Sequence, residues 1–258
     1  MSKYESAYIL SHTGLGDNIT MIGAINFLLL YYNHVYLLCK DKYKTNVELL
    51  INNSNVSIIS FDHKNEENNC KKIINSIDSN YNIDIFICGK HKSYLKSKIT
   101  NPSILNYKKN EKYDIKWKHI KMFYEDMNLD LNIYYDYFNI ISTELSIKLY
   151  ESIKELNIVF CHTQSSTKTI DLPDEMQSQY LNNNKYIVVC ANKNQYKKTH
   201  EYFELANKFV NIPLQHYIDI IKHACEIFLI DSCFCCIVHP LSMLNKLNTK
   251  TINYHIRR

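Results

Sequence analysis

Short apolar segments alternate with helix-like patterns along this chain of 258 residues, and the alternation starts again in the second half. Strands that alternate with helices form parallel βαβ units and doubly wound sheets. The predicted strands are Ala7–Leu10, His34–Cys39, Val56–Ser60 and Asp84–Cys88, then Asn157–Cys161, Tyr186–Ala191, Ile227–Ile230 and Thr249–Asn253. The sequence therefore predicts two consecutive α/β domains, residues 1–145 and 146–258.

Helical patterns fill the spaces between these strands. The predicted helices are Asp17–Tyr32, Lys44–Ile51, Glu67–Asn80, His91–Lys98, a connecting helix Ser142–Leu156, Tyr202–Phe209, Leu214–Cys225 and Cys233–Asn245. We expect Pro240 to kink the last helix or to end its first segment, because proline removes a helical hydrogen bond. Between Ile99 and Asn132 only Ile120–Met127 has a helical pattern.

Composition excludes several classes of protein. A net charge of +4, from 30 basic and 26 acidic residues, is too mixed to indicate nucleic-acid binding. The alternative is that the lysines around the single tryptophan bind oligonucleotides in a strongly salt-dependent way; these are Lys108, Lys109, Lys116, Lys118 and Lys121. No run of about 18 uncharged apolar residues, the length of a membrane span, appears, and the first residues lack the pattern of a secretory leader. We therefore expect no integral membrane segment and a cytoplasmic protein.

Nine cysteines, an odd number, do not predict a disulfide framework. Four of them end apolar strands, where cysteine acts as a small hydrophobic residue: Cys39, Cys88, Cys161 and Cys190. The cluster Cys233, Cys235 and Cys236 with His239 is the one possible metal group. It lacks the paired Cys-x-x-Cys spacing of a zinc site, so buried helix thiols are favoured and no metal site is predicted.

The stretch Ser11–Thr20 lies between a predicted strand and a predicted helix, and three of the four glycines fall in it or just after it. Strand, glycine turn and helix together direct helix amides toward a bound group. The stretch lacks the third glycine of a dinucleotide fingerprint and the Gly-Lys-Ser/Thr of a P-loop, so neither class is favoured. Asp17 is interpreted either as a helix cap or as a general base, and the two roles are compatible.

Polar residues follow the predicted strands of the second half, where ligands bind to open α/β sheets. The candidates for phosphate binding are His162, Ser165, Ser166, Thr167, Lys168, Asn192, Lys193, Asp231 and Ser232. Hydroxyls, a lysine and a helix start that Ser232 caps can together hold an anion, although a loop such as 162–168 is more often only solvated. No Asp-x-Asp occurs in the chain, which favours diphosphate binding without a metal.

Three motifs give the chain a resemblance to the GT-B glycosyltransferases of the heptosyltransferase-like group (family 9). Gly14-Leu15-Gly16-Asp17 matches the N-terminal Gly-Asp of that group. Residues 159–168 resemble the first strand and loop of its second domain, and residues 228–232 resemble its strand ending in Asp-Ser/Thr-Gly. Two positions depart from the pattern: Cys233 stands where the group has glycine, and Cys236 where it has histidine.

The resemblance implies two Rossmann-like domains that face each other across a cleft. It implies transfer of a sugar from a nucleotide-sugar donor to a hydroxyl acceptor such as a glycan, with inversion, without metal and with no cofactor besides the nucleotide sugar. Asp17 would be the base, with His12, Gly14 and Gly16 on the acceptor side and the phosphate-binding candidates of the second half on the donor side. Cys233 and Cys236 favour the alternative of a non-catalytic nucleotide- or glycan-binding protein. No oligomeric state is predicted.

Overall fold

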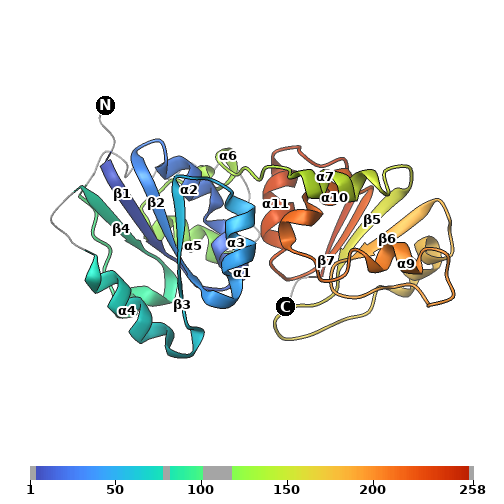
Figure 1. Cartoon of the computed structure of the whole chain (residues 1–258), viewed down its shortest axis with the longest axis horizontal. Coiled ribbons are helices and arrows are strands. Elements are labelled where there is room, and N and C mark those ends of the chain that lie inside the picture. Colours follow the sequence, from blue (N-terminus) through green and yellow to red (C-terminus); the bar gives the residue numbers. More distant parts are fainter. Residues whose placement is uncertain (1–3, 78–81, 101–117, 256–258) are drawn as a thin grey trace. The chain divides into compact units, whose positions relative to one another are not determined.

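The computed structural model describes residues 4–77, 82–100 and 118–255 (Figure 1). Three of the lysines considered for oligonucleotide binding, Lys108, Lys109 and Lys116, lie outside the described residues. The chain divides into two compact units, Met1–Ile141 and Ser142–Arg258, and each holds a sheet of four parallel strands. The predicted α/β architecture with two parallel sheets is therefore confirmed.

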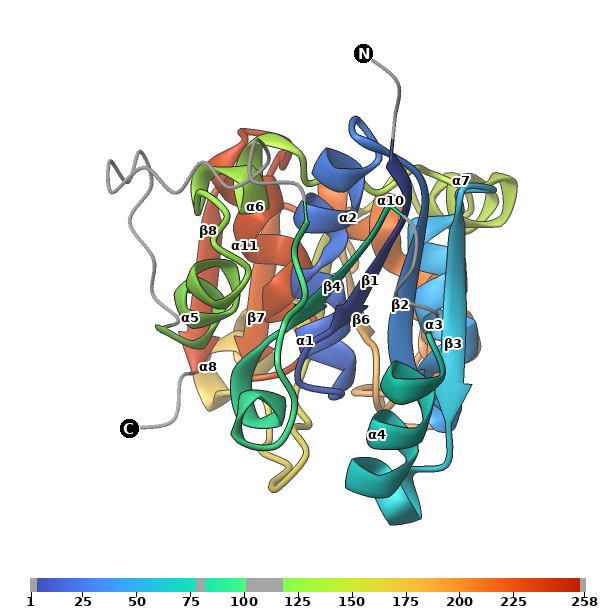
Figure 2. The ribbon, with the colours of Figure 1, turned by 90° about the vertical axis from the view of Figure 1, so that its left-hand side faces the viewer.

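The sheet of the first unit has the order β3-β2-β1-β4. Its strands are β1 (Tyr4–Leu10), β2 (Tyr32–Lys40), β3 (Val56–Phe61) and β4 (Ile83–Ile87). Figure 2 shows β1 between β2 and β4. Successive strands are added on one side of β1, and the chain then returns to place β4 on the other side. This reversal is the topological switch point, where open α/β sheets bind their ligands.

Short helices accompany this sheet: α1 (Leu15–Thr20), α2 (Ile22–Leu28), α3 (Lys44–Ile51), α4 (Glu66–Ser76), α5 (Lys118–Asp126) and α6 (Asn132–Asp136). The predicted helix Lys44–Ile51 is confirmed. In the described part of the chain, no helix is both long enough and apolar enough to cross a bilayer.

The prediction of one helix over Asp17–Tyr32 is wrong, because Met21 separates α1 from α2 and Tyr32 begins β2. The hydroxyl of Tyr124 accounts for the break. It donates to the carbonyl of Thr20 at 2.9 Å and accepts from the amide of Ala24 at 3.1 Å. These two groups would bond to each other in a continuous helix, so a side chain from α5 has entered the hydrogen-bond ladder.

The predicted helix His91–Lys98 is also wrong. A single 3₁₀ turn, η3 (Gly89–Ser93), is followed by extended chain that returns to the sheet. Lys98 pairs with Ile85, and the hydroxyl of Ser97 accepts the amide of Ile87 at 2.9 Å. The segment covers the edge of β4, whose free main-chain groups offer hydrogen bonds that a surface helix would leave unpaired.

The sheet of the second unit has the order β6-β5-β7-β8, with its switch point between β5 and β7. Its strands are β5 (Asn157–His162), β6 (Tyr186–Cys190), β7 (Glu226–Ile230) and β8 (Thr251–His255). Its helices are α7 (Glu144–Glu151), α8 (Asp174–Met176), α9 (Phe203–Asn207), α10 (Ile218–His223) and α11 (Cys235–Met243). The last strand begins later than predicted. The helix predicted from Cys233 begins at Cys235 and has no side-chain cap, so the cap predicted for Ser232 is wrong, and α11 runs through Pro240, which does not end it.

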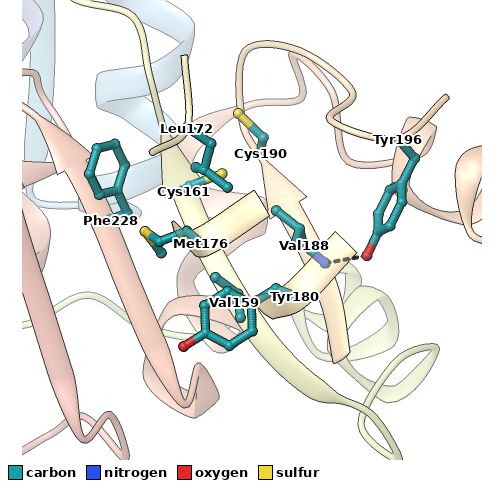
Figure 3. Close-up of a cluster of buried hydrophobic side chains, with 10 residues drawn as sticks. Val159, Cys161, Leu172, Met176, Tyr180, Val188, Cys190, Tyr196 and Phe228 are labelled. Atoms are coloured by element: carbon teal, nitrogen blue, oxygen red, sulfur yellow. Dashed lines mark hydrogen bonds between the residues drawn. The ribbon is translucent and has the colours of Figure 1, made fainter. Parts of the chain in front are cut away.

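A cluster of buried hydrophobic side chains packs on one face of this sheet (Figure 3). Cys161 of β5 and Cys190 of β6 are register partners and pack with Val159 and Val188. All four predicted strand-end cysteines are buried and unpaired. They are small core residues, as the sequence predicts.

Candidate functional site

In the first unit, polar groups gather at the switch point, at the carboxyl ends of β1 and β4. Gly14 has extended backbone, and its amide donates to Oδ2 of Asp17 at 3.1 Å. A Cβ atom at position 14 would lie 2.6 Å from Oδ2, so a larger residue there would require the Asp17 carboxylate to shift. The capping role predicted for Asp17 is confirmed. Among the described residues, its other oxygen, Oδ1, has no hydrogen-bond partner.

His12 lies two residues after the end of the switch-point strand β1 and is partly exposed. Its Nε2 accepts the main-chain amide of Lys90 at 2.7 Å, so the loops after β1 and β4 are joined through the imidazole. The ring of Phe123 packs edge-on against it, with ring centroids 4.9 Å apart. The structure thus brings His12 and the Gly14–Asp17 cap to the same edge of the sheet.

Glu66 is the residue of this edge that the sequence reasoning missed. Its carboxylate accepts from the hydroxyl of Thr13 at 2.7 Å and pairs with Lys40 at 3.0 Å and Lys90 at 2.8 Å. Burial opposes ionisation, but the hydrogen bonds from Lys90, Thr13 and Lys40 outweigh it and lower the pKa of Glu66 to about 2. Lys40 ends β2, and Thr13 and Lys90 follow β1 and β4 within three residues, so their positions at strand ends could have been recognised in the sequence.

In the second unit, His162 at the end of β5 meets Ser232 after β7, with Nδ1 2.9 Å from the serine oxygen. These two predicted residues, 70 positions apart, are therefore brought together at the switch point. Burial lowers the pKa of His162 to about 4, because a charged imidazole is poorly solvated there. At neutral pH the imidazole contributes hydrogen bonding and no positive charge.

This pKa can be checked directly. Titration of the protein by NMR should leave the Cε1–H resonance of His162 unmoved between pH 7.5 and about 5, with its shift centred near pH 4. The resonance is assigned by its loss in His162→Gln. A midpoint near the ordinary histidine value of about 6.5 would show that the ring is solvated.

The loop after β5 folds back on itself as a tight turn. The hydroxyl of Ser165 accepts the amides of Thr167 at 3.3 Å and Lys168 at 3.1 Å, and Gln164 pairs with Thr169. Ser165 therefore shapes the loop, while Ser166 and Lys168 are exposed on it.

Lys168 extends toward the last described strand. Its Nζ lies 3.4 Å from Nε2 of His255, at the end of β8. The carbonyl of His255 accepts the amide of Asp231 at 3.2 Å. His255, which the sequence reasoning did not include, thus links two predicted donor-side residues.

The two predicted residues after β6 have different surroundings. The side-chain oxygen of Asn192 accepts the amide of Thr163 at 2.9 Å, so Asn192 supports the loop after β5. Lys193 pairs with the exposed Asp171 at 2.6 Å. Asn192 is therefore placed to hold the loop, and Lys193 would have to leave Asp171 to reach a ligand.

Of the three cysteines predicted as buried helix thiols, Cys235 and Cys236 are buried in α11, whereas Cys233 precedes the helix and is only partly buried. Cys235 is buried, and burial raises the pKa of its thiol to about 12, far from the thiolate that binds metals. Among residues 4–77, 82–100 and 118–255, one group has metal-ligand spacing: the exposed Asp41, Asp62 and His63, whose ligand atoms lie within 4.8 Å of one another.

Comparison with known proteins identifies the fold. No protein-family model matches the sequence, and no curated protein matches it. Among solved structures, the glycosyl transferase family 9 protein from Veillonella parvula DSM 2008 is similar, with a TM-score of 0.58 at 13% identity over 98% of this chain and 83% of that one. The E. coli ADP-heptose LPS heptosyltransferase II has a TM-score of 0.55 at 10% identity over 98% of this chain and 90% of that one. The resemblance predicted from three short motifs is thus confirmed at the level of structure, and the chain has the fold of the family 9 glycosyltransferases.

Proposed function

We propose that the protein is a glycosyltransferase that moves a sugar from a nucleotide-sugar donor to a hydroxyl acceptor. The proposal rests on the hydrogen bonding of the Asp17 carboxylate in a chain that has the fold of the family 9 enzymes. One carboxylate oxygen caps α1, and no described residue occupies the other. A carboxylate that is held in place and keeps one oxygen available is suited to accept a proton.

The proposed reaction is a single displacement with inversion. The acceptor oxygen forms a bond to the anomeric carbon while Asp17 takes its proton. The bond from the anomeric carbon to the diphosphate oxygen breaks, and the nucleotide diphosphate leaves with the electron pair. Residues 1–145 would hold the acceptor, with His12, Gly14 and Gly16 near it, and residues 146–258 would hold the donor.

The donor side must stabilise negative charge that grows on the leaving diphosphate. We assign this to the hydroxyls of Ser232 and Ser166 and the ammonium of Lys168. His162 would orient the hydroxyl of Ser232, and Ser165, Asn192 and Asp231 would hold the loops in place; Lys193 is a further candidate. Metal independence is supported by the lack of Asp-x-Asp in the chain.

A donor panel tests the proposal. ADP-heptose, which the name of the E. coli neighbour suggests, is assayed beside UDP-, GDP-, TDP- and CMP-sugars, with methyl glycosides of glucose, galactose and mannose as acceptors and with EDTA or Mg²⁺ present. We expect nucleotide release with at least one donor, unchanged by EDTA. Thermal stabilisation by nucleotide sugars without any turnover would instead support the non-catalytic binding protein that the Cys233 and Cys236 departures favour.

Lys168→Met should raise the donor KM about tenfold, because an exposed lysine supplies charge to a phosphate without shaping the fold. The acceptor KM and the melting temperature should not change. Lys185→Met, which removes an exposed lysine elsewhere in the same unit, is the matched control. An unchanged donor KM in Lys168→Met would remove Lys168 from the donor site.

A further inference from the structure

The turn after β4 approaches His12 more closely than any residue except glycine allows. Gly89 has a φ of +60°, which favours glycine, and a Cβ atom there would lie 2.2 Å from Nε2 of His12. The other three glycines of the chain all lie between positions 14 and 23. Neither the proposed acid–base chemistry nor the sheet requires this closeness, so the contact between the turn and the imidazole needs an explanation of its own.

Asp126 of α5 clamps the same turn from the other side. Its Oδ2 accepts the amide of Gly89 at 2.7 Å, and its Oδ1 accepts Nζ of Lys92 at 2.6 Å. The next amide of the turn, from Lys90, then donates to His12 at 2.7 Å. The hydrogen bond from the Gly89 amide to the Asp126 carboxylate therefore sets the position of the next amide, that of Lys90, which faces the imidazole.

This geometry determines which nitrogen of His12 carries hydrogen. A main-chain amide only donates, so Nε2 must be the acceptor and the hydrogen lies on Nδ1. The edge-on contact with Phe123 limits rotation of the ring. Among the described residues, none forms a hydrogen bond with Nδ1. His12 thus keeps an N–H donor in a fixed direction, at the sheet edge where the Asp17 cap begins.

We propose that His12 donates its Nδ1–H to an oxygen of the acceptor sugar and that Gly89 and Asp126 are positioning residues that fix its tautomer. The proposal rests on the proposed glycosyl transfer. It assigns His12 to substrate binding and not to proton transfer, because Nε2 is already engaged. The acceptor is then a polyol with two recognised oxygens: one loses its proton to Asp17, and a second accepts from His12.

The tautomer is tested without any enzyme assay. In protein labelled with ¹⁵N in its histidines, Nε2 of His12 should have the shift of an unprotonated nitrogen and Nδ1 that of a protonated one. Asp126→Ala should convert this single tautomer to a mixture, and His63→Asn, an exposed histidine at the same sheet edge, should leave it unchanged. A protonated Nε2 in the wild-type protein would overturn the proposal.

Kinetics test the contact with substrate. With a methyl glycoside that is an acceptor, His12→Phe should raise the acceptor KM about tenfold, the loss expected for one hydrogen bond, with the donor KM unchanged. His12→Asn places an amide N–H near the former Nδ1 and should recover part of the affinity. Equal acceptor KM values in wild type, His12→Phe and His12→Asn would overturn the proposed contact.

Failure of the proposal and failure of the proposed function are distinguishable. If no donor supports transfer, the proposed function fails, and the same methyl glycosides are titrated into the labelled protein. A saturable shift of the His12 Nδ1–H signal would still support sugar binding at this residue. If the signal does not shift at any sugar concentration up to 100 mM, about the weakest Kd worth measuring, the proposed contact between His12 and sugar is wrong.

Discussion

Replacing Asp17 with asparagine should reduce sugar transfer by about 10²- to 10⁴-fold, the usual contribution of a general base, and leave the fold intact. The side-chain oxygen of asparagine can still accept the amide of Gly14, so the cap of α1 is kept. Asparagine cannot take the proton of the attacking hydroxyl. The measurements are kcat with the best donor and acceptor of the panel and the melting temperature of each variant.

Two further variants separate the roles of this carboxylate. Asp17→Ala removes the cap as well as the base, and it should lose about 1 kcal/mol of stability in addition to activity. Asp41→Asn changes an exposed carboxylate at the start of the 3₁₀ turn after β2 and should leave transfer unchanged. If Asp17→Asn transfers sugar at the wild-type rate, Asp17 is only a cap, and the proposed mechanism is wrong.

Replacing Gly23 with alanine should destabilise the protein by about 1–3 kcal/mol, the cost of overpacking a core. A Cβ atom at this position would lie 2.7 Å from the carbonyl oxygens of both Ile133 and Tyr134. These are main-chain atoms of α6, so no side chain can move aside, and α2 and α6 must separate. The direction of the change in the free energy of unfolding is informative, because replacing glycine with alanine in an exposed helix stabilises a protein by about 1 kcal/mol.

Urea denaturation followed by circular dichroism measures this effect. Thr45→Ala, at an exposed position of α3, is the control and should change the free energy of unfolding only slightly and in the stabilising direction. Hydrogen exchange should report faster opening of α2 and α6 in Gly23→Ala. Wild-type stability or better in this variant would mean that the two helices do not pack as closely as described.

The local features of this chain could be predicted from its sequence. Apolar runs bounded by polar residues mark strands such as β4, β5, β6 and β7, because these strands are buried along most of their length. The capping contact of Asp17 involves residues three positions apart, and the core role of cysteines such as Cys161 follows from their place at the end of apolar strands. Such features depend on residues that are close together in the sequence, so they can be predicted from the residue types and their spacing.

The tertiary structure decided where helices break and which polar groups meet. Tyr124 interrupts the first helix from 104 residues away, and no pattern near Met21 marks the break. The amide of Lys90 meets His12 across 78 residues, and Ser232 meets His162 across 70. These contacts exist because the strand order places β4 beside β1 and β7 beside β5. Hydrophobic periodicity predicts that strands form, whereas the order in which they pair depends on packing across the whole unit, and that order brings the polar ends of distant strands together.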